Sequence, residues 1–410
     1  MKKTIAGVII IPLAALAVYA QGDFTLNNVN ASDIMEASGN ISVQPAPALD
    51  SAGTALRKKN GIYSKSAGDA YEFPIRPGMK EWKALSSYAE MLKACQIPEP
   101  ILQKMSTAGL IETVLNYPLY MLTILAYDSM QQGFNVMAKR FNGIAELLER
   151  KDAGAELLAR YRGMDPAGFK EVPNGEGIGK YHFYFYRVEL LLAQAAIRAG
   201  LTEAQRLELQ KELLAKYEVK KRIGGYGGGL AKEVMSLNGI LWQEDSVRVS
   251  STVVHTPKGS TVPALQMEPK DEMPDVRQCD IEFIIGFPEA TWEAGCTRMY
   301  NCHSYAWHDQ SVLNTIWVDP PHQKEYWLDG SYIQWLGPVT SGMKLDYPAD
   351  NHSAIFVSGS NPFISPDKSI CRAKWGQGPR MLSTCKYAPY NSIGIIVYTL
   401  NNERPWQIWK

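Results

Sequence analysis

The sequence has no excess of charge of either sign, because its 42 lysine and arginine residues equal its 42 aspartate and glutamate residues. A zero balance gives no general electrostatic attraction toward the phosphates of nucleic acid or toward an anionic membrane surface. After the first twenty residues, no uninterrupted apolar run reaches the roughly 18 residues that a membrane span needs. We therefore expect no nucleic-acid partner and no stable membrane insertion.

The sequence also lacks the paired spacings of common metal and nucleotide sites. It has no Cys-x-x-Cys and no His-x-x-x-His pair, although a zinc site that uses Cys302, His303 and His308 can be drawn as an alternative. The glycine-rich segment 222–233, RIGGYGGGLAKE, follows no predicted strand and lacks the Gly-Lys-Ser/Thr ending of a phosphate loop. We interpret that segment as a hinge between helices, and we expect neither a metal nor a cofactor.

The start of the chain is typical of an exported protein. Two lysines precede a short apolar run, and Val18 and Ala20 provide the small residues that a signal peptidase requires before its cleavage position. We expect a signal peptide at 1–20, a bacterial source, and a periplasmic or extracellular location. The segment 21–76 is rich in Asn, Ser, Ala, Gly and Pro without a sustained apolar period, which predicts an extended leader.

The remaining chain predicts an α+β protein with a helical N-terminal scaffold. In 77–245 apolar residues recur at spacings of three and four, as in EWKALSSYAEMLKACQ at 81–96, where Cys95 is expected to be a buried free thiol. Thr202 predicts a helix N-cap within this domain of hairpin-like helices. In 246–410 a helix and an antiparallel sheet are expected, because short β-branched and aromatic runs alternate with turn residues. The predicted strands lie in 245–256, 279–287, 352–359, 369–375 and 392–400.

Cysteine pairing has several possible solutions. An oxidising compartment favours disulfides, but spacing alone does not define which cysteines pair. If Cys302 is free, one of three pairings of the other four joins Cys279 to Cys296 and Cys371 to Cys385. The alternative for Cys302 is a disulfide with Cys296 or Cys279.

Cys302 lies in the stretch TRMYNCHSYAWHDQS and begins a predicted helix over 302–317, with Asn301 before it as a possible cap. A helix N-terminus and a nearby imidazolium both stabilise a thiolate, which is the reactive form of cysteine. His303 is adjacent in sequence, but adjacent side chains on a helix diverge by about 100°. His352 opens the predicted strand HSAIFVSG and needs only to be near in the fold. We therefore predict Cys302 as the nucleophile and His352 as the general base.

This order of a cysteine at a helix start and a histidine on a later strand resembles the papain-like cysteine hydrolase superfamily, in particular the CHAP and NlpC-type amidase domains. YNCHSYAW is similar to their Asn-Cys helix start, DNHSAIFV to their histidine strand, and AKWGQG to the Asn-Ser-Trp-Gly turn of papain-type peptidases. The resemblance covers about residues 280–390. It implies a secreted thiol hydrolase that cleaves peptide-type amide bonds, in peptidoglycan or in protein, through a thioester and without a cofactor.

The chain departs from that family pattern at two positions. Ala373 stands where papain-type enzymes carry the asparagine that orients the histidine, and Cys296 stands where they carry the oxyanion glutamine. The side chains considered as substitutes are Asn301, Lys374, Asp367 and Asn361, beside the backbone N–H of Cys302. The departures leave open an inactive papain-like binding protein that recognises a partner through its helical domain and an aromatic groove. Acyl transfer by the same thioester route is a third possibility.

Aromatic residues are concentrated between the predicted nucleophile and base, above all in EYWLDGSYIQW at 325–335. In a hydrolase such an insertion forms a wall of the substrate groove, although the same side chains also fit core packing. The groove candidates are Trp307, Tyr326, Trp327, Trp335 and Trp375.

Overall fold

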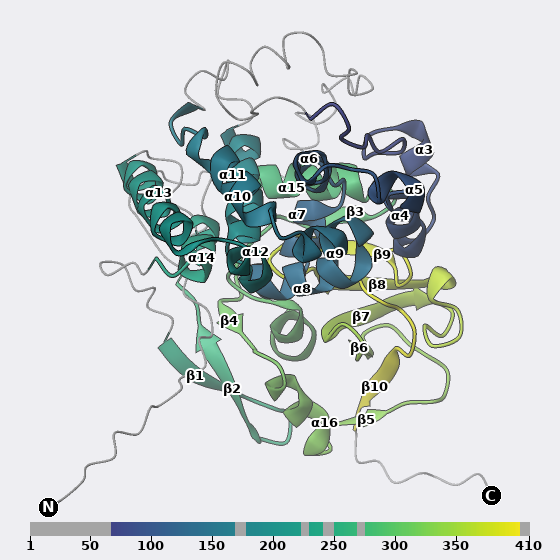
Figure 1. Cartoon of the computed structure of the whole chain (residues 1–410). Helices are drawn as coiled ribbons and strands as arrows, with labels where there is room; N and C mark the ends of the chain where they lie inside the picture. The colour runs from purple at the N-terminus through teal and green to yellow at the C-terminus, as the bar shows by residue number, and fades with distance from the viewer. Residues whose placement is uncertain (1–66, 169–177, 223–228, 241–249, 269–274, 402–410) are drawn as a thin grey trace, which may run out of the picture.

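The computed structural model of the protein describes residues 67–168, 178–222, 229–240, 250–268 and 275–401. The predicted signal peptide, most of the predicted leader and part of the predicted hinge lie outside these ranges. Figure 1 shows the helices gathered on one side of the molecule and most strands on the other. The expected α+β class, with helices first and an antiparallel sheet after them, is confirmed.

The N-terminal helices up to Arg162 follow one another with short links. In chain order the helices are α3 (Lys80–Lys83), α4 (Tyr88–Ala94), α5 (Glu99–Leu102), α6 (Thr107–Leu115), α7 (Tyr120–Leu125), α8 (Met130–Arg140), α9 (Asn142–Glu149), α10 (Ala153–Arg162), α11 (Ile178–Leu192), α12 (Ala195–Ala199), α13 (Glu203–Arg222), α14 (Gly229–Leu237), α15 (Asp275–Gly286) and α16 (Glu325–Leu328). Ser87, Ser106 and Ser129 cap α4, α6 and α8, since each hydroxyl accepts a backbone N–H three residues ahead. Within the described ranges, no helix combines the length and the apolarity that crossing a bilayer requires.

The strands form two antiparallel sheets. They are β1 (Ser250–His255), β2 (Thr261–Gln266), β3 (Thr291–Ala294), β4 (Ile316–Trp317), β5 (Tyr332–Gln334), β6 (Lys344–Tyr347), β7 (His352–Gly359), β8 (Ser369–Lys374), β9 (Arg380–Thr384) and β10 (Ile396–Leu400). The larger sheet has seven strands in the order β3-β9-β8-β7-β6-β10-β5, and the smaller has the order β1-β2-β4. The strand that carries His352 is therefore the central one of the larger sheet.

The larger sheet lies between two hydrophobic cores. Leu345, Ala354 and Phe356 belong to the core shared with the helices, whereas Ile355 and Tyr398 belong to a second core on the other side. Successive strand side chains point to opposite faces, so this alternation follows from the register of the strands. By the same alternation, the side chain at the first position of β7 faces the helices and that of the next residue faces the second core.

The predicted strand at 279–287 is wrong, because residues 279–286 belong to helix α15. Its buried residues include Asp275, Cys279 and Phe283, which recur every four residues and place one face of a helix against α7 and α11. Asp275 accepts a hydrogen bond from the hydroxyl of Tyr186 at 2.6 Å and pairs with His182 Nδ1 at 2.7 Å. These tertiary contacts override the strand preference of an isoleucine-rich run.

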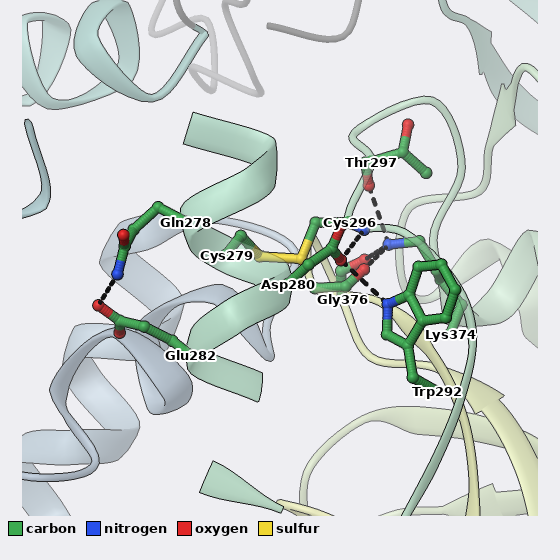
Figure 2. The surroundings of a disulfide bond; sticks show 10 residues. Gln278, Cys279, Asp280, Glu282, Trp292, Cys296, Thr297, Lys374 and Gly376 are labelled. Atoms are coloured by element: carbon green, nitrogen blue, oxygen red, sulfur yellow. Dashed lines mark hydrogen bonds between the residues drawn. A yellow bond between two sulfur atoms is a disulfide. The ribbon is translucent and has the colours of Figure 1, made fainter. Parts of the chain in front are cut away.

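A disulfide joins Cys279 of α15 to Cys296, which follows β3 (Figure 2). Beside it, Asp280 accepts hydrogen bonds from the backbone N–H of Cys296 at 2.7 Å and from Trp292 Nε1 at 3.2 Å. The first half of the predicted pairing is thus confirmed. The bridge excludes Cys296 and Cys279 as partners of any other cysteine.

The other four cysteines carry free, buried thiols. Cys95 and Cys302 are free as expected, so the predicted alternative of a bridged Cys302 is wrong. Cys371 and Cys385, the second pair in the prediction, are also free thiols. They adjoin one another beside Tyr347, whose hydroxyl lies 3.4 Å from Cys371 Sγ.

Replacing both Cys279 and Cys296 by alanine is expected to lower the free energy of unfolding by about 3 kcal/mol. The bridge spans a sequence separation of 17 residues, and its loss frees that loop in the unfolded chain. Urea denaturation of the double variant beside wild type, without reductant, measures the loss. Wild type treated with a reductant should shift to the same midpoint, and an unchanged midpoint in the double variant would contradict the expectation.

Candidate functional site

The predicted nucleophile opens a short helical turn that is capped by the residue before it. Helical conformation begins at Cys302 and ends at His308, well short of the predicted 302–317, because Asp309 is extended. The side-chain oxygen of Asn301 accepts the backbone N–H of Ser304 at 3.0 Å, which confirms the predicted cap. We call residues 302–308 the Cys302 turn.

Asn301 is committed to holding this turn in place. Its Nδ2 donates to the carbonyl oxygen of Val318 at 2.8 Å and to Asp128 Oδ2 at 3.1 Å. An amide nitrogen has two hydrogens, and both are used here. The prediction that Asn301 donates to an oxyanion is therefore not supported. The side chain of Asn301 instead attaches the Cys302 turn to the helices.

The thiol of Cys302 is buried, with 3% of the residue exposed. Burial raises the pKa of this thiol well above its usual range, and the negative charge of Asp128 raises it further. The backbone N–H groups of Ser353 and His303 and the charge of Lys374 oppose these effects without reversing them. The sequence-based expectation of a stabilised thiolate is therefore wrong for this conformation, which holds the neutral thiol.

His352 lies between aromatic rings. It is 1% exposed, its ring stacks on Tyr390 with centroids 3.5 Å apart and planes at 10°, and Tyr347 packs against it edge-on at 5.2 Å. Neither ring nitrogen has a hydrogen-bond partner among the described residues. Burial lowers the pKa of His352 well below its usual range, and the neighbouring His303 lowers it further, so the imidazole is neutral.

The fold brings the Cys302 turn and the start of β7 together. The backbone N–H of Ser353, the residue after His352, lies against the thiol, and Ser353 Oγ lies 2.9 Å from His303 Nδ1 and accepts from Trp307 Nε1 at 2.8 Å. No hydrogen bond joins His352 to the sulfur. The two predicted residues therefore occupy adjoining elements, but their side chains are not hydrogen-bonded to one another in this conformation.

Of two candidates for orienting the histidine, one is hydrogen-bonded to other groups and the other lies away from the imidazole. Lys374 is fully buried and donates to the carbonyl oxygens of Thr297 at 2.9 Å, Gly376 at 2.7 Å and Gly378. Asp367 is exposed in the short helix Pro366–Lys368, beyond the end of β7 that is opposite to His352. Both predictions are corrected, since neither side chain is available to the imidazole. Asn361 likewise follows the far end of β7.

Asp128 is a site residue that the sequence did not reveal. It lies between α7 and α8, is partly buried, and accepts the hydrogen bond from Asn301. Burial raises its pKa to about 7, and the charge of Asp319 adds to this effect. The segment AYDSM that contains it has no motif, because Ser129 only marks the start of α8. The contact with the Cys302 turn is made only by tertiary folding.

The groove predicted from aromatic residues is largely core. Trp307, Tyr326 and Trp375 are no more than 4% exposed, so they are corrected from groove candidates to packing residues. Trp327 and Trp335 are half-buried, with Trp327 stacked on Tyr398 and Trp335 Nε1 donating to Pro338 at 2.7 Å. Only these two of the five have surface to offer a ligand. Among the described residues, no three histidine, cysteine or acidic side chains gather as metal ligands do.

Comparison with known proteins gave no matching family model, no matching curated protein and no matching solved structure.

Proposed function

We propose that the chain is an exported cysteine hydrolase that cleaves peptide-type amide bonds, with Cys302 as nucleophile and His352 as general base. The observation that carries this proposal is the placement of the thiol against the backbone N–H of Ser353, one residue from His352. A second link supports it, because Tyr390 stacks on the imidazole and interacts electrostatically with the same thiol. Nucleophile and base need such proximity in the fold rather than in sequence.

The neutral state of both groups favours proton transfer during attack rather than a preformed ion pair. His352 would take the thiol proton as the Sγ–carbon bond forms, and return it to the amine as the tetrahedral intermediate collapses to a thioester. Water, deprotonated by the same imidazole, would then release the acid and restore the thiol. The backbone N–H of Cys302 is our candidate for the oxyanion donor. The hydrogen bond from thiol to imidazole would form with bound substrate, since such contacts are often loose in resting enzymes.

The proposed substrate is a peptide, either in cell-wall peptidoglycan or in a protein, as the family resemblance implies. Trp327 and Trp335 are half-buried aromatic side chains in the segment between nucleophile and base. Aromatic side chains of this kind provide large contact areas with little loss of rotamer freedom. They are therefore our candidates for contacting the substrate.

A second function, that of an inactive binding protein with the same fold, is favoured by one observation. Burial of the Cys302 thiol and the charge of the nearby Asp128 both oppose ionisation of Cys302. An enzyme in its active conformation would have the reverse arrangement, with the thiolate stabilised.

Alkylation kinetics separate the two functions. Mature protein is treated with iodoacetamide between pH 5 and pH 10, and each modified cysteine is quantified by mass spectrometry. Cys95, a buried thiol whose pKa burial raises to about 12, serves as the internal reference. For a hydrolase, Cys302 should react at least about 10²-fold faster than Cys95 at pH 7, and His352→Ala should lower that rate by about 10²-fold.

The matched control is His255→Ala, which removes an exposed imidazole on β1 and should leave the rate unchanged. If Cys302 reacts no faster than Cys95, and only as it ionises above pH 9, the hydrolase proposal fails and the binding protein is favoured.

A further inference from the structure

The imidazole of His352 has no polar group to orient it. Ala373 stands where the family pattern has an asparagine, and Lys374 and Asp367 are engaged or placed elsewhere. Both ring nitrogens are without a hydrogen-bond partner among residues in the described ranges. A base held by nothing would sample several rotamers, which conflicts with the need to keep it aligned with the nucleophile.

Aromatic contacts hold this ring instead. The ring of Tyr390 covers one face of the imidazole at a centroid distance of 3.5 Å, and the planes differ by only 10°. Tyr347, across the β6–β7 pair, closes another side at 5.2 Å and 65°. Rotation of the imidazole about its Cβ–Cγ bond would drive its edge into the ring of Tyr390, so the stack fixes the plane of the base.

Tyr390 is itself held by the helical region. Its hydroxyl donates to the carbonyl oxygen of Ala126 at 2.6 Å, and its ring packs edge-on against Tyr127 at 5.7 Å. The hydroxyl is thus committed to the link between α7 and α8. Only the face of the ring is directed to His352.

One guanidinium fixes the spacing between Tyr390 and His352. Arg140 of α8 binds both carboxylate oxygens of Asp350, at 2.6 and 2.7 Å, and donates to the carbonyl oxygen of Pro389 at 3.4 Å. Asp350 also accepts the backbone N–H of Asn391. The residues on both sides of Tyr390 and the turn before β7 are therefore tied to a single side chain.

We propose that Tyr390 is the positioning residue of the hydrolase, and that its stacked ring replaces the polar third group that orients the histidine in related enzymes. The inference rests on the proposed function and deepens it. The electron-rich face of Tyr390 also stabilises the imidazolium that forms when His352 accepts the thiol proton. Because the ring and not the hydroxyl does this, phenylalanine should serve at the position.

The test measures alkylation of Cys302 by iodoacetamide from pH 5 to pH 10, in the full mature chain. Tyr390→Leu removes the stack and should lower the rate at pH 7 by about 10-fold or more, leaving a profile that follows thiol ionisation alone. Tyr390→Phe should keep both the rate and the profile of wild type. Tyr390→Met provides a second non-aromatic variant in case leucine does not fold, and Tyr117→Leu, which removes a buried tyrosine stacked on Phe141, controls for general loss of packing.

The outcomes distinguish this inference from the proposed function. If Tyr390→Leu and Tyr390→Met keep the wild-type profile while His352→Ala abolishes it, Tyr390 does not position the base. If the non-aromatic variants react faster, Tyr390 blocks the imidazole instead of aligning it. If His352→Ala itself has no effect, the hydrolase proposal fails and the positioning role with it.

Discussion

Replacing Cys302 by alanine is expected to abolish amide hydrolysis, lowering kcat/KM by at least about 10³-fold. Alanine has no atom that can form the thioester. Cys302→Ser should be nearly as inactive, because its hydroxyl ionises far less readily than a thiol and burial lowers the pKa of His352, which makes the imidazole a weak base. The loss of kcat/KM should therefore depend on removal of the sulfur atom and not on the change in side-chain volume.

The measurement is the release of new amino groups from peptidoglycan fragments and from a denatured protein, followed by mass spectrometry of the products. Cys95→Ala, which removes a free thiol from the end of α4, should retain full activity. Equal release by wild type and Cys302→Ala would assign any hydrolysis to another site. No release by wild type from either substrate class would favour the binding protein.

Central strands and capped helices were predictable because their signals are local. The run HSAIFVSG is apolar over most of its length and is bounded by turn residues, and β7 occupies it from His352 to Gly359. Its position in the middle of the sheet, buried on both faces, explains the nearly continuous apolar pattern. Thr202 likewise caps α13 through its contact with the backbone N–H of Gln205 at 3.3 Å.

The error at 279–287 shows where local signals fail. Ile281 and Ile285 give the segment a strand-like composition, yet both are exposed on the outer face of α15. The deciding contacts are the pair of Asp275 with His182 on α11 and the disulfide of Cys279. His182 is distant in the sequence, and the spacing of the cysteines does not define which of them pair. The helical period of four residues is carried by only a few buried positions, so from the sequence alone it could not outweigh the strand preference of the isoleucines.

The two residues that we propose as nucleophile and base could be selected from the sequence, whereas their surroundings could not. Cys302 and His352 belong to short motifs, whereas Asp128 and Tyr390 are placed only by contacts across the fold, such as that of Tyr390 with Ala126, 264 positions away. The sequence analysis consequently predicted the wrong direction for the shift of the Cys302 thiol pKa. A helix start favours the thiolate, but complete burial and the charge of Asp128 have larger effects.

Which aromatic side chains are exposed could not be predicted from the sequence either. Trp307 and Trp327 lie in similar aromatic segments, and their rings are 5.1 Å apart. Trp307 is nevertheless buried because the Cys302 turn packs on the central strands, while Trp327 lies on the short helix α16 near the outer strand β5. Which layer covers a side chain depends on the order of the strands, and that order is not local information.

Lys374→Met is expected to cause the largest loss of stability, at least about 3 kcal/mol in the free energy of unfolding. The ammonium of Lys374 is buried at the end of β8 and donates to the carbonyl oxygen of Gly378 and to those of Thr297 and Gly376, which are labelled in Figure 2. Methionine matches the length of lysine but donates no hydrogen bond, so the buried carbonyl groups of Gly376 and Gly378 and the half-buried one of Thr297 would lose this partner. Each such loss costs about 1–3 kcal/mol.

The position of these carbonyls explains why the effect should extend to the site. Thr297 follows the bridged Cys296 and precedes the Cys302 turn, and Gly376 packs its backbone against that of Ala126. Urea denaturation of Lys374→Met beside Lys368→Met, which alters an exposed lysine, measures the loss without a change in net charge between the two variants. If the two midpoints agree, the carbonyl groups have found other donors, and Lys374 does not hold the Cys302 turn against the sheet. A large difference combined with slower alkylation of Cys302 in folded Lys374→Met would show that this cation also supports the reactive geometry.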